Sequence, residues 1–193
     1  MNRSSKIHRK TDETEINISL NIDGIGKYKI NTPIGFFNHM LTQIAKHGKF
    51  DIEINAKGDT EVDYHHLVED IGITLGLCFK EALKNYKGIK RFSTFTVPMD
   101  EALTNVTIDI SNRPFLIYNV KIKNEKVGDF DTELVREFFI SFTNNFRCTL
   151  HINNFYGDNS HHIIESIFKA FAICLKDALK IVSDDIPSTK GVI

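Results

Sequence analysis

Two copies of a His-His-x-x-Glu motif, one in each half of the chain, constrain the fold more than any other feature. His65-His66-x-x-Glu69 lies 96 residues before His161-His162-x-x-Glu165. The same shift also pairs residues later in both segments: Cys78 with Cys174, Lys80 with Lys176 and Leu83 with Leu179. Two unrelated amphipathic helices would share leucines but not the paired histidines. The sequence therefore predicts an internal duplication.

Hydrophobic periodicity predicts a similar order of strands and helices in the two halves. The first half is expected to contain strands over residues 16–22, 27–30 and 50–56, and helices over 33–48 and 63–86. The second half is expected to contain strands over 93–97, 104–110, 115–123 and 147–152, a helix after 131 and a helix over 160–181. The strands over 50–54 and 148–152 align with nearly the same shift as the motifs. Thr32 is the expected N-cap of the first helix, with Pro33 as its first residue.

These elements predict an α+β fold of two βα halves related by a pseudo-twofold axis. Each half is expected to be a small, mostly antiparallel sheet packed with two helices. The boundary is expected between residues 1–90 and 91–193, within one compact unit that ends in a loop over 184–193. A chain of 193 residues can bury a core of this kind without disulfides or a structural metal.

Charge and composition exclude several classes of protein. The 24 basic and 25 acidic residues leave a net charge of −1, which argues against a general nucleic-acid binder. No apolar run approaches the roughly 20 residues of a membrane span, and the polar, basic segment 1–10 does not resemble a secretory signal. Three scattered cysteines, Cys78, Cys148 and Cys174, fit a reducing compartment, so a cytoplasmic location is expected.

The repeated motif has the geometry of a metal site. Residues four apart lie on one face of a helix, so His65 and Glu69 can bind one ion, and His161 and Glu165 another. His66 and His162 point about 100° away from the preceding histidines, and a pseudo-twofold axis would let each reach the ion of the other helix. Nitrogen and carboxylate ligands without thiolate suit Mn, Fe, Co or Zn.

Each of these sets of three has room for another ligand. His39 and His151 are the candidates. His39 lies in line with Gln43 and His47 on the first predicted helix, whereas His151 lies on a predicted strand with Leu150 and Ile152 on the opposite face.

Over nearly its whole length the chain resembles the imidazoleglycerol-phosphate dehydratase family. The matching segments include Arg9-Lys-Thr-x-Glu13-Thr, Phe36-Phe-Asn-His39-Met-Leu, Asp63-Tyr-His-His-Leu-Val-Glu-Asp70-Ile-Gly, Pro98-Met-Asp-Glu-Ala-Leu103, Asp109-Ile-Ser-Asn-Arg113-Pro, Asn159-Ser-His-His-Ile-Ile-Glu165 and Pro187-Ser-Thr-Lys-Gly191. Three positions depart from the usual pattern: Pro33 and Asn38 stand where the family usually has Gly and Asp, and Asn112 replaces a usual Gly.

The resemblance implies a hydro-lyase that converts imidazoleglycerol phosphate to imidazole-acetol phosphate and water in histidine biosynthesis. It implies two Mn²⁺ ions per active site. One ion is expected on His39, His66, His161 and Glu165, and the other on His65, Glu69, His151 and His162, which agrees with the division argued from helix geometry. The resemblance also implies a hollow homo-oligomer of 24 subunits with active sites between subunits.

The resemblance further implies how the substrate reacts and what holds it. The metals would stabilise an imidazolate, whose electrons expel the hydroxyl on the adjacent carbon to give a diazafulvene. Glu13 is the candidate base for the neighbouring C–H. The residues expected to bind the substrate are Glu13, His39, His47, Arg91, Arg113, Lys169, Ser188 and Lys190. Ser188 and Lys190 lie in an aperiodic tail that can act as a lid.

Three other functions use some of the same features. A dinuclear metallohydrolase would use the same ligands, so a substrate assay separates it from a dehydratase. A metal-storage or di-iron bundle would place Glu and Glu-x-x-His on four facing helices, whereas here the order is reversed and strands intervene. An RNA-binding α/β module would need a basic-aromatic strand motif that the sequence lacks.

Overall fold

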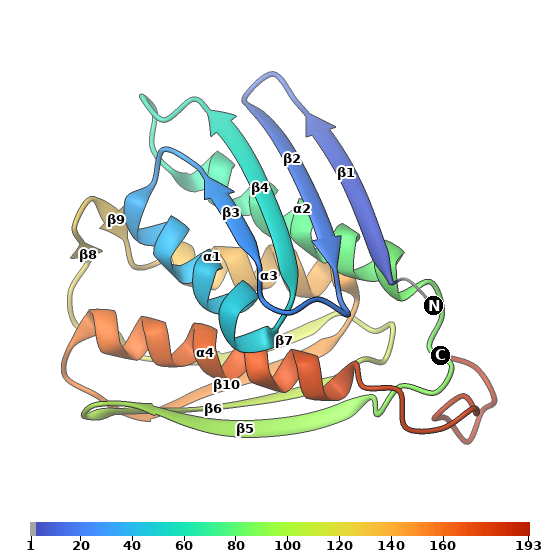
Figure 1. Ribbon diagram of the computed structural model, residues 1–193. Helices are drawn as coiled ribbons and strands as arrows, with labels where there is room; N and C mark the ends of the chain where they lie inside the picture. Colours follow the sequence, from blue (N-terminus) through green and yellow to red (C-terminus); the bar gives the residue numbers. More distant parts are fainter. Residues whose placement is uncertain (1–2) are drawn as a thin grey trace.

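The computed structural model describes residues 3–193, which form four helices, two four-stranded sheets and a two-stranded hairpin. The helices lie between the two larger sheets (Figure 1). The elements of the first half are β1 (Ser4–Lys10), β2 (Thr14–Asn21), β3 (Tyr28–Asn31), α1 (Gly35–Gly48), β4 (Asp51–Gly58) and α2 (His65–Leu83). Those of the second half are β5 (Phe92–Met99), β6 (Ala102–Asp109), β7 (Phe115–Asn119), β8 (Lys126–Val127), β9 (Phe130–Asp131), α3 (Leu134–Phe146), β10 (Thr149–Tyr156) and α4 (Ser160–Ala178).

The two four-stranded sheets have the same topology. Their strand orders are β1-β2-β4-β3 and β5-β6-β10-β7. In each sheet the first three strands pair antiparallel, and the last strand pairs parallel with its neighbour. The small β8–β9 hairpin occurs only in the second half. The predicted α+β fold with duplicated βα halves is confirmed.

The helices join the two halves into one core. Helix α2 covers the first sheet and α4 covers the second, while α1 packs on α4 and α3 packs on α2. Aromatic side chains fill the contacts between these helices, as in the edge-to-face pairs of Phe79 with Phe142 and of Phe139 with Phe171. Buried apolar side chains from both halves form one contiguous cluster. Within residues 3–193, no helix is both long enough and apolar enough to cross a membrane.

Several element boundaries differ from those predicted. Strand β1 was not predicted, because its residues are mostly polar and it is stabilised by pairing with β2 rather than by its own apolar face. The β8–β9 hairpin was also missed, and β7 ends at Asn119 rather than at residue 123. Helix α4 ends at Ala178 instead of residue 181.

The start of α1 also differs from the prediction. Its N-cap is Ile34 rather than Thr32. The Thr32 hydroxyl instead accepts a hydrogen bond from the Ile34 N–H at 3.1 Å and closes the turn before the helix.

Candidate functional site

Three predicted ligands converge at the N-terminal ends of α1 and α4. Their ligand atoms, from His39, His161 and Glu165, all lie within 4.8 Å of one another. Nε2 of His39 and Nε2 of His161 lie 3.2 Å and 3.0 Å from the same oxygen, Oε2 of Glu165. Donor atoms that bind one ion at about 2.1 Å and at right angles lie about 3 Å apart. The three residues therefore fit a transition-metal ion.

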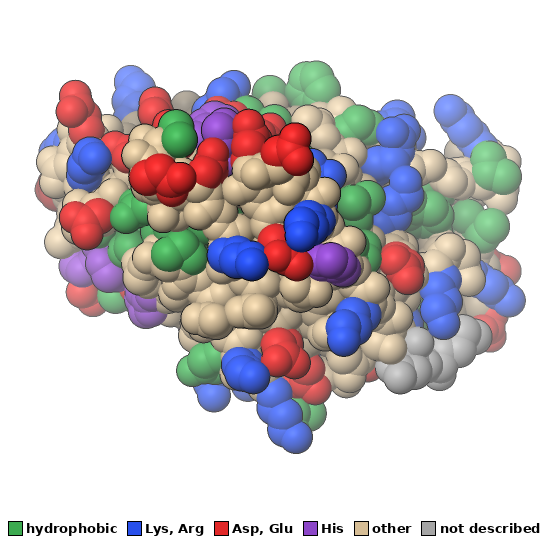
Figure 2. Space-filling view, turned by 90° about the horizontal axis from the view of Figure 1, so that it is seen from above, with side chains coloured by type: hydrophobic (Ala, Val, Ile, Leu, Met, Phe, Trp, Pro, Cys, Tyr) green, Lys and Arg blue, Asp and Glu red, His purple; other side chains and the backbone are tan. Residues whose placement is uncertain are grey.

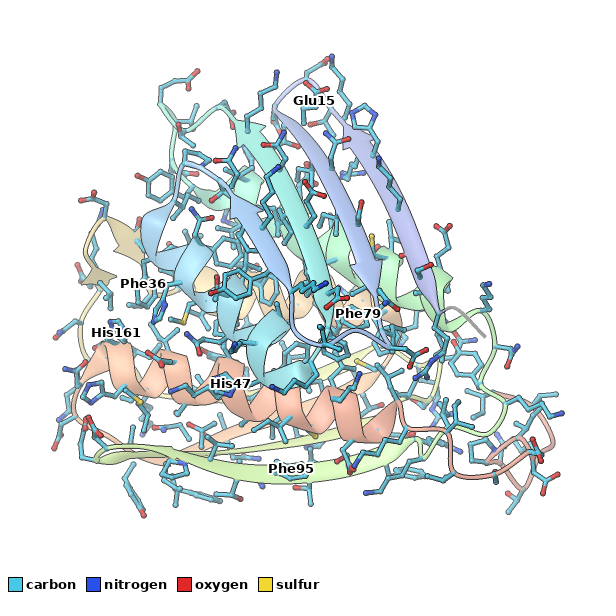
Figure 3. The ribbon with its side chains drawn as sticks, viewed as in Figure 1. Glu15, Phe36, His47, Phe79, Phe95 and His161 are labelled. Atoms are coloured by element: carbon cyan, nitrogen blue, oxygen red, sulfur yellow. The ribbon has the colours of Figure 1, made fainter. Side chains whose placement is uncertain are left out.

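The packing of α1 on α4 brings these side chains together. His161 and Glu165 lie one turn apart on α4, and His39 reaches them from α1. The Phe36 ring packs edge-on against the His161 ring, with 5.2 Å between ring centroids, and both labels lie at the same end of the two helices in Figure 3. The Asn159 side chain caps α4 by accepting hydrogen bonds from the N–H groups of His161 and His162.

The Glu165 carboxylate is held in its ionised form. Nζ of Lys169 lies 2.6 Å from Oε1, the oxygen that does not contact the histidines. Burial of Glu165 opposes ionisation, but hydrogen bonds from Lys169, His39 and His161 outweigh it and lower the pKa of the carboxyl to about 2. A carboxylate that stays anionic at neutral pH is what a metal ligand requires.

A second group of predicted residues surrounds the start of α2. Nε2 of His66 lies 3.8 Å from Oε1 of Glu13, and Nδ1 of His66 lies 3.0 Å from Oδ2 of Asp59. His65 adjoins His66, with ring centroids 6.3 Å apart, and Glu69 lies one turn further along the helix. The structure thus places the candidate base beside His66, one of the predicted ligands.

Side chains of the segment Arg9–Thr14 attach the β1–β2 turn to α2. Nε of Arg9 donates to Oδ1 of Asp70 at 2.9 Å, and the Thr14 hydroxyl donates to Oδ2 of the same carboxylate. Arg9 and Thr14 come from opposite sides of the turn that carries Glu13. These contacts fix Glu13 next to the first turn of α2.

Neither predicted four-ligand set is complete within one chain. Among the residues that the structure describes, His39, His161 and Glu165 are the one group of three or more ligand atoms this close together. His66 contacts Glu13 and Asp59 rather than His161, and His162 contacts Glu101. Figure 2 likewise shows histidine side chains at separate places on one face. The two motifs therefore do not share ions across the pseudo-twofold axis of a single chain.

His151 lies apart from the other predicted ligands. It is on the outward face of the second sheet, between Thr107 of β6 and Ile117 of β7. Leu150 and Ile152 are buried on the other face, as predicted.

The pseudo-twofold axis pairs His39 with Glu137 instead of with His151. Helices α1 and α3 both end before a residue in the left-handed conformation, Lys49 and Arg147 respectively. Aligning these two residues matches His39 to Glu137, a half-buried residue of α3 that was not among the predicted ligands. The signal was present, because the predicted strands over 50–54 and 148–152 align with this same shift.

Helix α3 lies along α2 in the same direction. A Cβ at Gly72 would meet Phe138 and Ser141, and a Cβ at Gly76, one turn later, would meet Phe142 and Asn145. The neighbours on α3 thus advance in step with α2. Because α1 lies along α4 in the corresponding way, Glu137 occupies the place beside α2 that His39 occupies beside α4.

Four residues expected to bind the substrate gather near the C-terminal end of α4: Arg91, Arg113, Ser188 and Lys190. Nε of Arg91 donates to Oδ1 of Asp109 at 2.7 Å, and Nη1 donates to the carbonyl of Pro187 at 2.7 Å. Nη2 of Arg113 lies 3.4 Å from Oδ2 of Asp109. The Pro187 contact brings the tail with Ser188 and Lys190 to this group, at the right of Figure 1.

Arg91 lies far from His161 of the same chain. The Arg91 N–H donates to the carbonyl of Ala178, the last residue of α4, whereas His161 lies in the first turn of that helix. At about 1.5 Å per residue, the two ends of α4 are about 25 Å apart. A small phosphate ester cannot span that distance.

His47 and Lys169 lie between these two ends. His47 is near the end of α1, and Figure 3 shows it further along the helices than His161. Partial burial and the nearby Lys169 cation lower the pKa of His47, so the imidazole is neutral at physiological pH.

Comparison with known proteins identifies the family. The model of the imidazoleglycerol-phosphate dehydratase family matches residues 32–175. An imidazoleglycerol-phosphate dehydratase of Caldanaerobacter subterraneus is 56% identical over 193 residues, which cover 99% of this chain and 100% of the relative. The chain belongs to the imidazoleglycerol-phosphate dehydratase family. The predicted activity class, a hydro-lyase of histidine biosynthesis, is confirmed by this membership.

Further imidazoleglycerol-phosphate dehydratases show the same similarity. The enzyme of Clostridioides difficile is 55% identical over 188 residues, which cover 97% of this chain and 98% of the relative. The crystal structure of the enzyme from Staphylococcus aureus subsp. aureus N315 has a TM-score of 0.85 at 44% identity and covers 93% of this chain and 99% of that chain. The structure from Pyrococcus furiosus has a TM-score of 0.85 at 38% identity, covering 97% and 100%.

Two of the departures from the dehydratase pattern have local structural roles. The Asn38 amide donates to the carbonyl of Thr32 at 2.9 Å and accepts from its hydroxyl at 2.8 Å. Asn38 therefore stabilises the start of α1, and an aspartate could not donate the first of these bonds. Asn112 has a φ of 57°, and its side-chain oxygen accepts from Nε of Arg147 at 2.7 Å. The structure offers no comparable account of Pro33.

Proposed function

We propose that this dehydratase is metal-dependent and uses two divalent ions, Mn²⁺ by resemblance, in each active site. The convergence of His39, His161 and Glu165 carries the proposal, because two imidazole nitrogens lie about one ligand–ligand distance from an ionised carboxylate. Nitrogen and oxygen donors without sulfur suit Mn²⁺ and similar ions. The buried thiols of all three cysteines are unpaired, which favours a cytoplasmic location.

The first ion would bind His39, His161 and Glu165 of one subunit together with His66 of another. The second would bind His65 and Glu69 with His162 of another subunit. For the remaining position the sequence predicts His151, whereas the pseudo-twofold relation to His39 favours Glu137. Replacing each of these two residues with alanine and counting bound Mn²⁺ per subunit decides between them.

The active sites are proposed to form between subunits of a homo-oligomer, with 24 subunits implied by resemblance. Two observations support this. The ligand sets are incomplete within one chain, and Arg91 lies at the far end of α4, about 25 Å from His161. A neighbouring subunit must then supply Arg91, Arg113 and the tail to a site built on the histidines.

The bound ions would supply Lewis-acid stabilisation of negative charge on the imidazole ring. Electrons from the ring would then expel the hydroxyl of the adjacent carbon, which would take up the proton released from the ring N–H and leave as water, giving a diazafulvene. Glu13 removes the proton from the neighbouring carbon, and the resulting enol becomes the ketone of imidazole-acetol phosphate. The 3.8 Å between Oε1 of Glu13 and Nε2 of His66, a proposed metal ligand, supports this role.

The remaining proposed substrate contacts are cationic or neutral donors. Arg91 is held rigidly by Asp109 and Pro187, while Arg113 is largely exposed and free to turn toward a phosphate. Ser188 and Lys190 would close over the phosphate from the tail. Lys169 and His47 would contact the substrate from α4 and α1.

The deciding experiment incubates the Mn²⁺-loaded protein with imidazoleglycerol phosphate and measures imidazole-acetol phosphate. A chelator should abolish the product, and added Mn²⁺ should restore it. Release of inorganic phosphate without the acetol product would instead indicate a dinuclear metallohydrolase. Full turnover in metal-free protein would contradict the proposed metal dependence.

Glu13→Gln tests the proposed base. Turnover should fall by a factor on the order of 10²–10⁴, as expected when a general base is lost. The number of bound Mn²⁺ ions should not change, because Glu13 is not a proposed ligand. A variant that turns over like the wild type would remove Glu13 from the mechanism.

A further inference from the structure

The imidazole of His162 is held by a carboxylate from the turn between β5 and β6. Oε2 of Glu101 lies 2.7 Å from Nδ1 of His162. Oε1 of the same carboxylate accepts hydrogen bonds from the N–H groups of Asn159 at 2.8 Å and Asp158 at 3.2 Å. Glu101 therefore attaches the His162 ring to the backbone that begins α4.

The other ring nitrogen of His162 has no such partner. Oδ2 of Asp100 lies 3.7 Å from Nε2, which is beyond hydrogen-bonding distance. Because a carboxylate accepts hydrogen bonds, the bond to Glu101 favours the tautomer with the proton on Nδ1. Nε2 is then left with a free lone pair.

The first half reaches the same arrangement with a different residue. Glu101 directly precedes β6 as Glu13 directly precedes β2, so the two glutamates are counterparts in the duplication. In the first half, however, it is Asp59, following β4, that lies 3.0 Å from Nδ1 of His66. In each half a carboxylate binds Nδ1 of the second histidine of the motif. Two separate chain positions thus impose the same orientation on the two rings.

We propose that Glu101 is a positioning residue that holds His162 with its proton on Nδ1 and presents Nε2 as the metal-binding atom. The metal-binding role of His162 rests on the proposed function, whereas the tautomer does not. A carboxylate behind a ligand histidine fixes the ring and raises its basicity, and loss of such a partner costs about 10–100-fold in metal affinity.

Glu101→Gln separates this role from the cap on α4. The carboxamide oxygen can still accept from the N–H groups of Asp158 and Asn159. Its NH₂ group would then face Nδ1 of His162 and donate to it, which moves the ring proton to Nε2. Glu15→Gln is the matched control, because Glu15 also contacts a histidine, with Oε1 3.3 Å from Nε2 of His8, and lies on the first sheet outside the proposed site.

Two measurements on the full chain test the proposal. The first is ¹⁵N solid-state NMR of histidine-labelled, metal-free protein at about pH 9, where imidazole is neutral, with His162→Asn to assign the signal. The second is Mn²⁺ affinity, from the free ion measured by electron paramagnetic resonance. Wild type and Glu15→Gln should carry the His162 proton on Nδ1. In Glu101→Gln the His162 proton should lie on Nε2. Of the two Mn²⁺ ions in each site, the one bound by His162 should bind about 10–100-fold more weakly.

Two results would overturn the proposal. One is a wild-type His162 protonated on Nε2, which decides the question even if Glu101→Gln does not fold. The other is a folded Glu101→Gln variant with wild-type tautomer and wild-type Mn²⁺ affinity, which would leave Glu101 as a helix cap alone. Failure of the proposed function is distinguishable, because it would appear as wild-type protein without metal-dependent turnover while the tautomer measurement needs neither metal nor substrate.

Discussion

Gly76 in the middle of α2 is the position where one added methyl group should separate the two halves. A Cβ at Gly76 would lie 2.7 Å from the carbonyl oxygen of Phe142 and 3.0 Å from the backbone nitrogen of Phe146. Both atoms belong to the backbone of α3, so no side-chain rotation can relieve the contact. The two helices must move apart along an interface in which Gly76, Phe142 and Phe146 are buried.

The magnitude follows from two opposing effects. Alanine gains about 1 kcal/mol over glycine in a helix interior. Overpacking of a core costs about 1–3 kcal/mol, and contact with rigid backbone places Gly76→Ala at the upper end of this range. We therefore expect the free energy of unfolding to fall by about 2 kcal/mol. The methyl group adds little apolar surface that could offset this loss.

Urea unfolding at fixed protein concentration, in chelator, measures this change without metal binding. Gly35→Ala is the matched control, because Gly35 lies in the first turn of α1 and a Cβ there has no neighbour within 4 Å. The control should unfold at or above the wild-type urea concentration. If Gly76→Ala also unfolds there, the close approach of α2 and α3 does not constrain this interface and the reasoning is wrong.

Three further predictions concern charged side chains. Burial of the Asp177 carboxylate opposes ionisation, but hydrogen bonds from Lys180, Lys90 and Ser93 outweigh it and lower its pKa. The ionised Asp177 therefore stabilises the fold above the unfolded pKa of about 3.9, and this contribution is lost as pH falls through the folded pKa. In urea unfolding, the difference in free energy of unfolding between wild type and Asp177→Asn should shrink below about pH 4. Lys176→Met should lower the free energy of unfolding by about 1–3 kcal/mol in the same assay, because Nζ of Lys176 donates to the Ile22 carbonyl at 2.5 Å and joins the two halves. An unchanged urea midpoint would show that water replaces this donor. Glu165→Gln should lower Mn²⁺ affinity at one ion per active site in dialysis experiments, and wild-type stoichiometry and affinity would exclude Glu165 as a ligand.

The sequence alone determined the duplication, the order of the principal strands and helices, and the family. These features are local or repetitive: apolar residues recur with the period of each element, and the paired motifs stand at the same place in each half. Strand β1 and the β8–β9 hairpin escaped prediction because pairing with another strand, rather than their own apolar pattern, stabilises them.

Only the tertiary structure decided which motif residues meet. Helix α1 of the first half packs on α4 of the second, so His39 joins His161 and Glu165, whereas the two His-His-x-x-Glu motifs stay apart. The tertiary structure also placed His151 on the outward face of the second sheet and paired Glu101 with His162. Periodicity specifies which face of an element is buried. It does not specify the element against which that face packs, because many apolar surfaces are complementary enough to form a core.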